Sequence, residues 1–192
     1  MTGLTLGILG LALTALMCGI GSGIGLKYTS TATAGVVAED PKKRSKVMLL
    51  TLLPATQGLY GFVIAIIGAS VQLPTTAKIA GLITNGVTDP VLSAQVMAQG
   101  WNIFMACLPM MIGGMVSAIL QGKASAATII AVGKNSEASK AFLFPAMIEF
   151  YALLGMVASI LLLFNIPVAS IPNIPVTPAT ETAATLISLV VG

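Results

Sequence analysis

Two related stretches decide the fold: LLPATQGLYG at residues 52–61 and LFPAMIEFYA at residues 143–152. Each lies in a long apolar run, and the two share a proline, an alanine and a tyrosine at an offset of 91 residues. Self-similarity at a fixed offset indicates an internal repeat. We therefore expect a duplicated helical hairpin.

Long apolar segments surround both motifs. They cover residues 4–37, 47–71, 98–132 and 141–165. About 20 helical residues cross a hydrocarbon core of ~30 Å, so each segment is long enough to span a bilayer. The first and third exceed that length and are expected to tilt or project beyond the membrane. The predicted fold class is an all-α membrane protein with four transmembrane helices in two duplicated hairpins.

Composition supports a membrane location. Of the 192 residues, 56% are hydrophobic and 8% are charged, and the mean hydropathy is +0.99, whereas soluble domains are about 25% charged. Lipid is therefore the first expected partner. The net charge of +3 could suggest nucleic acid. However, most basic residues occupy two short loops, as in cytoplasmic loops of membrane proteins: Lys42, Lys43, Arg44, Lys46, Lys134 and Lys140.

The charged loops divide the chain into four parts. We expect a first hairpin at residues 1–71, a non-cytoplasmic connecting loop at 72–97, a second hairpin at 98–165 and a Pro-rich tail at 166–192. The apolar N-terminus lacks the basic start of a signal peptide and is interpreted as a retained span. The apolar piece at 183–191 is too short to span and is expected at the interface or against the bundle.

Several other kinds of site are not supported by the sequence. Cys18 and Cys107 lie in apolar runs without a CxxC spacing, and the chain has no histidine. These cysteines are expected to be small buried residues. The GIGSGIG run at 19–25 resembles a phosphate loop but lacks a preceding strand. Its small residues are better suited to close packing of membrane helices.

Glu149 is the only acidic residue inside a predicted span. A charged carboxylate at that depth costs at least ~2.5 kcal/mol, so the side chain must be protonated or hold a cation. The structural alternative is an ion pair with Lys27 or Lys123, which are the two lysines within predicted spans. Otherwise these lysines are expected to face inward or extend toward anionic lipid.

Oxygen-bearing side chains lie at the depth of Glu149. Gln57 and Gln121 are eleven and thirteen residues from the cytoplasmic loops, and Glu149 is nine. Leu53, Thr56, Gln57 and Tyr60 share one helix face through their i, i+3, i+4 and i+7 spacing. Oxygen ligands that carry one negative charge among them suit Na⁺, because a monovalent cation leaves the site neutral. Binding of a proton in place of Na⁺ remains an alternative. A further alternative is that these polar side chains only form hydrogen bonds between helices.

The motifs LLPATQGLYGF, ILQGK and AMIEFYALLG resemble the membrane rotor proteolipid of V-type and A-type ATPases, in particular its sodium-type members. The resemblance covers about residues 5–165. It implies a homo-oligomeric ring that turns against a static membrane subunit with an essential Arg and is joined to a central-stalk subunit. ATP hydrolysis on other subunits would drive rotation, or ion flow would drive synthesis, so this subunit would be non-catalytic. The implied location is a prokaryotic cell membrane.

The resemblance also implies a ligand set. Its Na⁺ ligands would be Leu53 through its backbone carbonyl, Thr56, Gln57, Gln121 and Glu149, with Tyr60 in support. Gly58 matches Glu149 in the repeat, so one protomer would carry one ion. Phe150 departs from the family pattern, in which a small polar residue is expected, and so does the tail. Outside this class, a tetraspan channel or an assembly scaffold with a structural Glu149 stays open.

Overall fold

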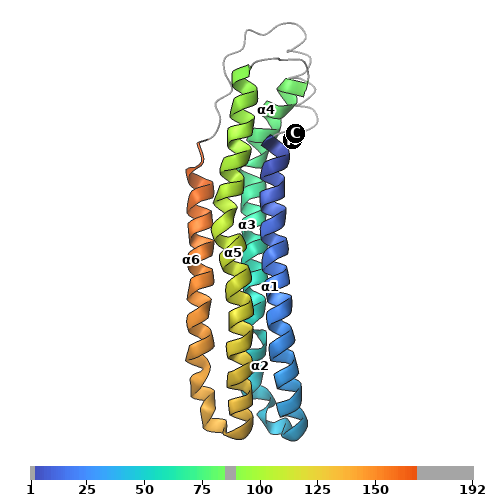
Figure 1. Cartoon of the computed structure of the whole chain (residues 1–192), viewed down its shortest axis with the longest axis vertical. Coiled ribbons are helices and arrows are strands. Elements are labelled where there is room, and N and C mark those ends of the chain that lie inside the picture. Colours follow the sequence, from blue (N-terminus) through green and yellow to red (C-terminus); the bar gives the residue numbers. More distant parts are fainter. Residues whose placement is uncertain (1–2, 85–89, 168–192) are drawn as a thin grey trace.

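The computed structural model describes residues 3–84 and 90–167, which form helices and no strand. Figure 1 shows long helices lying side by side, with the two short connections at one end and α4 at the other. Short 3₁₀ turns, η1 (Pro41–Lys43), η2 (Leu53–Ala55) and η3 (Ser136–Phe142), connect them. The α-helices are α1 (Gly3–Glu39), α2 (Arg44–Leu52), α3 (Thr56–Val71), α4 (Leu73–Thr84), α5 (Pro90–Lys134) and α6 (Leu143–Asn165).

Among the described residues, four helical segments are long and apolar enough to cross a membrane, as the sequence predicted. They are Gly3–Glu39, Pro41–Val71, Pro90–Lys134 and Ser136–Asn165. The predicted all-α fold with four spans is therefore confirmed. At 1.5 Å per residue, the 45 residues of α5 extend ~67 Å, about twice the thickness of a hydrocarbon core. This helix must tilt or project beyond the membrane.

Helices α1 and α5 lie parallel and form the most closely packed pair. A Cβ atom added to Gly122 would overlap the Cα of Gly25, and one added to Gly21 would lie 2.7 Å from the carbonyl oxygen of Met115. The backbones can approach this closely because these positions lack side chains. Helix α3 packs on α1, and α6 packs on α5. The Gly-rich helices α1 and α5 therefore form a central pair, and α3 and α6 pack against it.

Prolines interrupt two of the spans, and other helices satisfy the backbone groups nearby. Pro54 lies in η2, where the second span changes from α2 to α3. Pro109 lies inside α5, and the next residue, Met110, donates its backbone N–H to Ser159 Oγ of α6 at 3.1 Å. The carbonyl of Met110 accepts a hydrogen bond from Cys18 Sγ at 3.3 Å. Both free cysteines are buried, as predicted.

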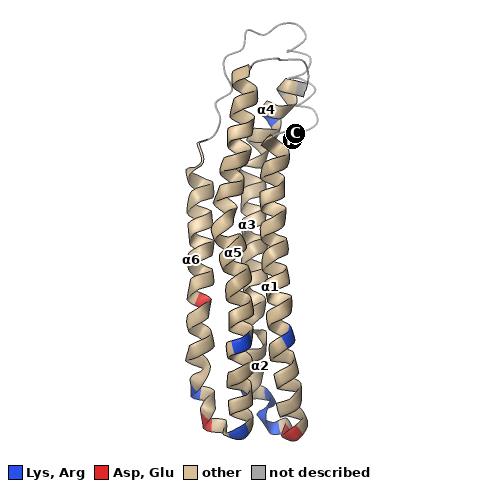
Figure 2. Ribbon diagram, in the orientation of Figure 1, with Lys and Arg blue, Asp and Glu red and all other residues tan. Residues whose placement is uncertain are grey.

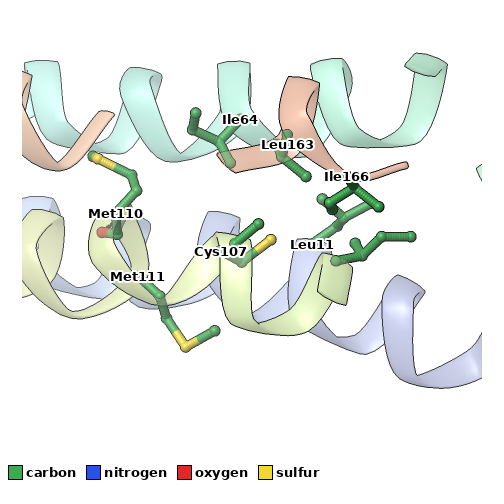
Figure 3. Packing of buried hydrophobic residues seen from close by; sticks show 10 residues of the cluster. Leu11, Ile64, Cys107, Met110, Met111, Leu163 and Ile166 are labelled. Carbon is green, nitrogen blue, oxygen red and sulfur yellow. Dashed lines mark hydrogen bonds between the residues drawn. The ribbon is translucent and has the colours of Figure 1, made fainter. Parts of the chain in front are cut away.

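The main apolar core joins α1, α3, α5 and α6, and Figure 3 shows its side chains converging between the helices. Every member is buried, so the core ties the first hairpin to the second. It includes Leu11, Ile64, Cys107, Met110, Met111, Leu163 and Ile166.

The segment at 72–97 was expected to be a connecting loop, and this expectation is wrong for most of it. The segment contains α4 and the first turns of α5, and only residues 85–89 lie outside the described chain. Ile79 packs against Leu92 and Val96. Two buried amides are paired: Gln72 Nε2 donates to the Leu163 carbonyl at 2.6 Å, and Gln99 Nε2 donates to Gln72 Oε1 at 3.0 Å. In the tail, residues 168–192, including the apolar piece at 183–191, lie outside the described residues.

The two short connections meet at one end of the bundle, where basic residues gather in Figure 2. Asp40 and Asn135 cap the turns by accepting backbone N–H groups from Lys42 and Glu137. Lys43 Nζ donates to the Gly133 carbonyl at 2.6 Å. This bond links the first connection to the end of α5, so the two hairpins are joined at their loops.

Candidate ion-binding site

Glu149 lies on α6 and turns its carboxylate toward α3 and α5. Oε1 accepts a hydrogen bond from Thr56 Oγ1 at 2.7 Å. Oε2 accepts from Gln121 Nε2 at 2.7 Å and from Gln57 Nε2 at 3.3 Å. Three polar groups from two neighbouring helices therefore surround a carboxylate that is itself only partly buried.

The Thr56 hydroxyl lies at the centre of an oxygen cluster. Its Oγ1 is 2.8 Å from the Leu53 carbonyl oxygen, 3.3 Å from Gln57 Oε1 and 2.7 Å from Glu149 Oε1. A hydroxyl has a single hydrogen to donate, so it can satisfy only one of these three acceptors at a time. Converging oxygens that outnumber the available hydrogens are a suitable surrounding for a cation.

Two buried amides hold the other side of the carboxylate. Gln57 and Gln121 are both 0% exposed. Gln57 Nε2 donates to Gln121 Oε1, and Gln121 Nε2 also donates to the carbonyl of Pro145 at 3.1 Å. Because a buried amide is costly to leave without partners, this network fixes the two side chains beside Glu149.

The structure brings together all the residues that the sequence singled out. Leu53 and Thr56 come from η2 and the start of α3, Gln57 follows them, Gln121 comes from α5 and Glu149 from α6. The half-buried Tyr60 side chain is close enough to interact with Glu149 and Thr56. Their role as Na⁺ ligands stays a prediction. Sequence reasoning missed the Pro145 carbonyl as a partner of Gln121, because backbone groups carry no residue-type signal.

Lysine does not neutralise Glu149. Lys27 and Lys123 are exposed on α1 and α5, and Lys123 Nζ lies 5.8 Å from the centre of the Tyr28 ring. Within residues 3–84 and 90–167, the ion pairs are Lys43–Asp40 and Lys140–Glu137, both at the loop end. The structural alternative in which Glu149 pairs with a membrane lysine is therefore wrong.

The first hairpin has no equivalent site. Gly58 matches Glu149 in the repeat, and its backbone N–H donates to Ser22 Oγ at 2.8 Å. A Cβ atom at Gly58 would lie 3.1 Å from that oxygen. Met147 and Ile148, which match Thr56 and Gln57 at the same offset, are apolar. The repeat therefore preserves the fold but not the polar groups.

The chemistry of the donor set fits a small hard cation. Carbonyl, hydroxyl, amide and carboxylate oxygens converge, and Glu149 supplies the one negative charge. Among the described residues no three His, Cys, Asp or Glu side chains cluster, so this is not a site of the transition-metal type. With one negative charge, a monovalent cation leaves the site neutral.

These features define a class: membrane proteins with duplicated helical hairpins and a single carboxylate in the interior of the described spans. The sequence profile of the ATP synthase C subunit matches the chain twice, at residues 9–68 and 104–162, once in each hairpin. The chain belongs to this family, among the rotor proteolipids of V-type and A-type ATPases. The duplication and the family predicted from the motifs are confirmed.

Two curated relatives match most of the chain. The V-type sodium ATPase subunit K of Enterococcus hirae is 37% identical over 164 residues, which are 85% of this chain and 93% of that protein. The A-type ATP synthase subunit K of Methanocaldococcus jannaschii is 36% identical over 164 residues, which are 85% of this chain and 64% of that protein.

Proposed function

We propose that this protein is the ring subunit that binds Na⁺ and carries it across the membrane in a V-type rotary ATPase. The observation that carries the proposal is the surrounding of Glu149. Its carboxylate lies within a membrane-spanning helix, has no lysine partner among the described residues and faces a cluster of hydroxyl, amide and carbonyl groups.

Charge balance explains why such a site can move through lipid. An ionised Glu149 without a counter-ion would carry a large desolvation cost at this depth. Na⁺ removes the net charge, and the oxygens of Leu53, Thr56 and Gln57 replace water around the ion. A divalent ion would leave one positive charge, so a single carboxylate favours a monovalent cation.

Na⁺ is favoured over H⁺ because of the number of oxygens. A proton on Glu149 needs only one acceptor, whereas Thr56 Oγ1 already lies near three acceptor oxygens from Leu53, Gln57 and Glu149. The relative from Enterococcus hirae is a sodium ATPase subunit by name. A proton-carrying ring is the alternative, and it predicts a different response of Glu149 to Na⁺.

The proposed assembly is a homo-oligomeric ring in a prokaryotic cell membrane. Its outer surface would contain α3 and α6, which carry exposed large apolar residues including Leu59, Phe62, Phe150 and Leu154. From there Glu149 would meet a static subunit whose Arg helps exchange the ion. The short loops would lie in the cytoplasm, near a central-stalk subunit. ATP would be hydrolysed or made on other subunits, so this chain would be non-catalytic.

Carbodiimide labelling tests the proposal directly, because the oxygen of a protonated carboxyl group adds to the reagent's electrophilic carbon. We expect Glu149 in purified protein to be labelled in Na⁺-free buffer and to be protected by Na⁺ at neutral pH. Glu149→Gln should abolish labelling, whereas Glu137→Gln, at an exposed loop position, should leave it unchanged. Labelling that responds to pH but not to Na⁺ would support a proton ring. An unreactive Glu149 would favour the scaffold and contradict the proposal.

A further inference from the structure

One side chain of the Gly-rich run of α1, that of Ser22, bonds to the helix that carries most of the predicted ligands. Ser22 Oγ accepts the backbone N–H of Gly58 at 2.8 Å, and the side chain is 6% exposed. Gly58 belongs to α3 and directly follows Thr56 and Gln57. A buried hydroxyl of the first span is therefore attached to the backbone of the turn that carries two of these ligands.

Helix α3 starts without a side-chain cap of its own. The first N–H groups of a helix depend on acceptors outside its regular bonding, and a polar residue just before the helix usually accepts the N–H of the second or third residue. In α3 that preceding residue is Ala55, which makes no side-chain cap bond. Gly58 is the third residue of α3, so Ser22 supplies the cap oxygen from another helix.

The same turn determines where the Leu53 carbonyl oxygen lies. Thr56 donates its backbone N–H to this oxygen, three residues back, and its Oγ1 lies 2.8 Å from it. The 3₁₀ turn η2 therefore directs the carbonyl toward the Thr56 hydroxyl. Any shift in the start of α3 would move the Leu53 and Thr56 oxygens together.

Close packing fixes Ser22 relative to the neighbouring helices. Helix α1 packs against both α3 and α5 (Figure 1). Three residues after Ser22, a Cβ atom added to Gly25 would lie 2.7 Å from Pro54 Cβ and 2.6 Å from the Ala118 carbonyl oxygen. Because α1 has so little freedom to move here, Ser22 is a rigid anchor for the first turn of α3.

We propose that Ser22 is a positioning residue for the sodium site. It supplies no ligand, but by accepting the Gly58 N–H it holds the first turn of α3 where Thr56 and Gln57 meet Glu149. The role also accounts for glycine at position 58, since a Cβ atom there would lie 3.1 Å from Ser22 Oγ. This inference rests on the proposed function, because it concerns the affinity of the same site for Na⁺.

The test is Ser22→Ala in the purified, assembled protein, with carbodiimide labelling of Glu149 measured across a Na⁺ titration at neutral pH. Without the cap, the turn occupies other geometries and only a fraction of the protein is ready to bind. The Na⁺ concentration that half-protects Glu149 should therefore rise about fivefold, as expected for the loss of one helix cap.

The matched control is Ser117→Ala on α5. Ser117 is also buried, but its Oγ donates to the Gly114 carbonyl of its own helix at 3.1 Å. Its removal is the same chemical change four residues from Gln121, and it should leave the Na⁺ midpoint of the wild type unchanged. An equal rise in both variants would show a general effect of losing a buried hydroxyl and would overturn the positioning role.

A double substitution distinguishes positioning from general destabilisation. Ser22 acts through the turn that carries Thr56, so in a Thr56→Val background Ser22→Ala should raise the midpoint by only about twofold or less. The full fivefold rise in that background would mean that the two residues act independently, against the proposal. If Ser22→Ala does not assemble, Ser22→Thr keeps the hydroxyl and must retain the wild-type midpoint.

The wild-type titration separates this inference from the proposed function. Sodium protection of the wild type, together with equal midpoints for the wild type and Ser22→Ala, would overturn the positioning role alone. A wild-type Glu149 that Na⁺ does not protect would overturn the sodium function, and the positioning role with it.

Discussion

The hydroxyl of Thr56 connects both halves of the candidate site. It follows the turn at Pro54 and lies within 2.8 Å of the Leu53 carbonyl and 2.7 Å of the Glu149 carboxylate. The first contact is within its own helical segment and the second is between hairpins. The same atom can therefore help to hold an ion and to hold α6 against α3.

We expect Thr56→Val to weaken Na⁺ binding, because it removes an oxygen at almost constant volume. A hydrogen bond to a charged group contributes about 1.5–3 kcal/mol, so the Na⁺ concentration that half-protects Glu149 should rise by about tenfold or more. Thr56→Ser keeps the oxygen and should stay near the wild type. The measurement is carbodiimide labelling across a Na⁺ titration. Equal titrations for the Val and Ser variants would contradict a ligand role for Thr56.

Residue-level prediction succeeded where a side chain carried the signal. Leu53, Thr56, Gln57 and Tyr60 share a helix face by spacing alone, and the depth count brought Gln121 and Glu149 to their level. The Pro145 carbonyl and the bond from Gly58 N–H to Ser22 Oγ could not be predicted in this way. Both depend on how closely two helices approach, which one sequence does not specify.

At the scale of helices, glycine sets the position of α5 against α1. Gly122 is next to Gln121, so a close approach of the two backbones lies one residue from a member of the site. A change in this packing would move Gln121 relative to Glu149. Helix packing and the geometry of the candidate ion site are therefore coupled at this position.

We expect Gly122→Ala to destabilise the protein, because its Cβ would overlap the Gly25 Cα. Overpacking of this kind costs about 1–3 kcal/mol. Gly113→Ala is the matched control on α5, where nothing lies within 4 Å, and alanine should there be neutral or stabilising. Thermal unfolding of the detergent-solubilised protein, followed by circular dichroism, provides the measurement. If both variants melt together, the backbone contact does not limit stability.

Helix α4 shows where sequence reasoning failed. Polar residues in and around it suggested a loop, but Gln72 and Thr76 are buried and bonded within the bundle, and Gln99 of α5 donates to Gln72. Ile79, Leu92 and Val96 form a small apolar core at helical spacing. The polar composition of the segment concealed its helical pattern of buried residues, because a polar side chain with a partner can be as buried as an apolar one.

At the scale of the whole molecule, the two hairpins share a fold but not a function. The first has Gly58 where the second has Glu149, and its helices offer no second carboxylate within a span. The predicted load is therefore one ion for each chain of four spans.

We expect purified protein to bind one Na⁺ per chain, measured with radioactive sodium at saturation. Gly58→Glu should not raise this number to two, because the new side chain would meet Ser22, and the matching Met147 and Ile148 supply no oxygen ligands. Glu149→Gln should reduce binding to background. Two ions per wild-type chain would contradict the single-site interpretation, and none would contradict the sodium site itself.

Gly58, whose N–H bonds to Ser22, occupies the place of a carboxylate in the first hairpin, and this affects how the proposed motor would use energy. A rotor built from this chain passes four helices beneath the stator for every ion, so one revolution moves half the charge of a rotor with an acid in every hairpin. Each elementary charge costs about 2.3 kcal/mol for every 100 mV it crosses. If the same number of ATP molecules is hydrolysed per revolution, twice as much free energy is available for each ion. The rotor can then move ions against about twice the membrane voltage.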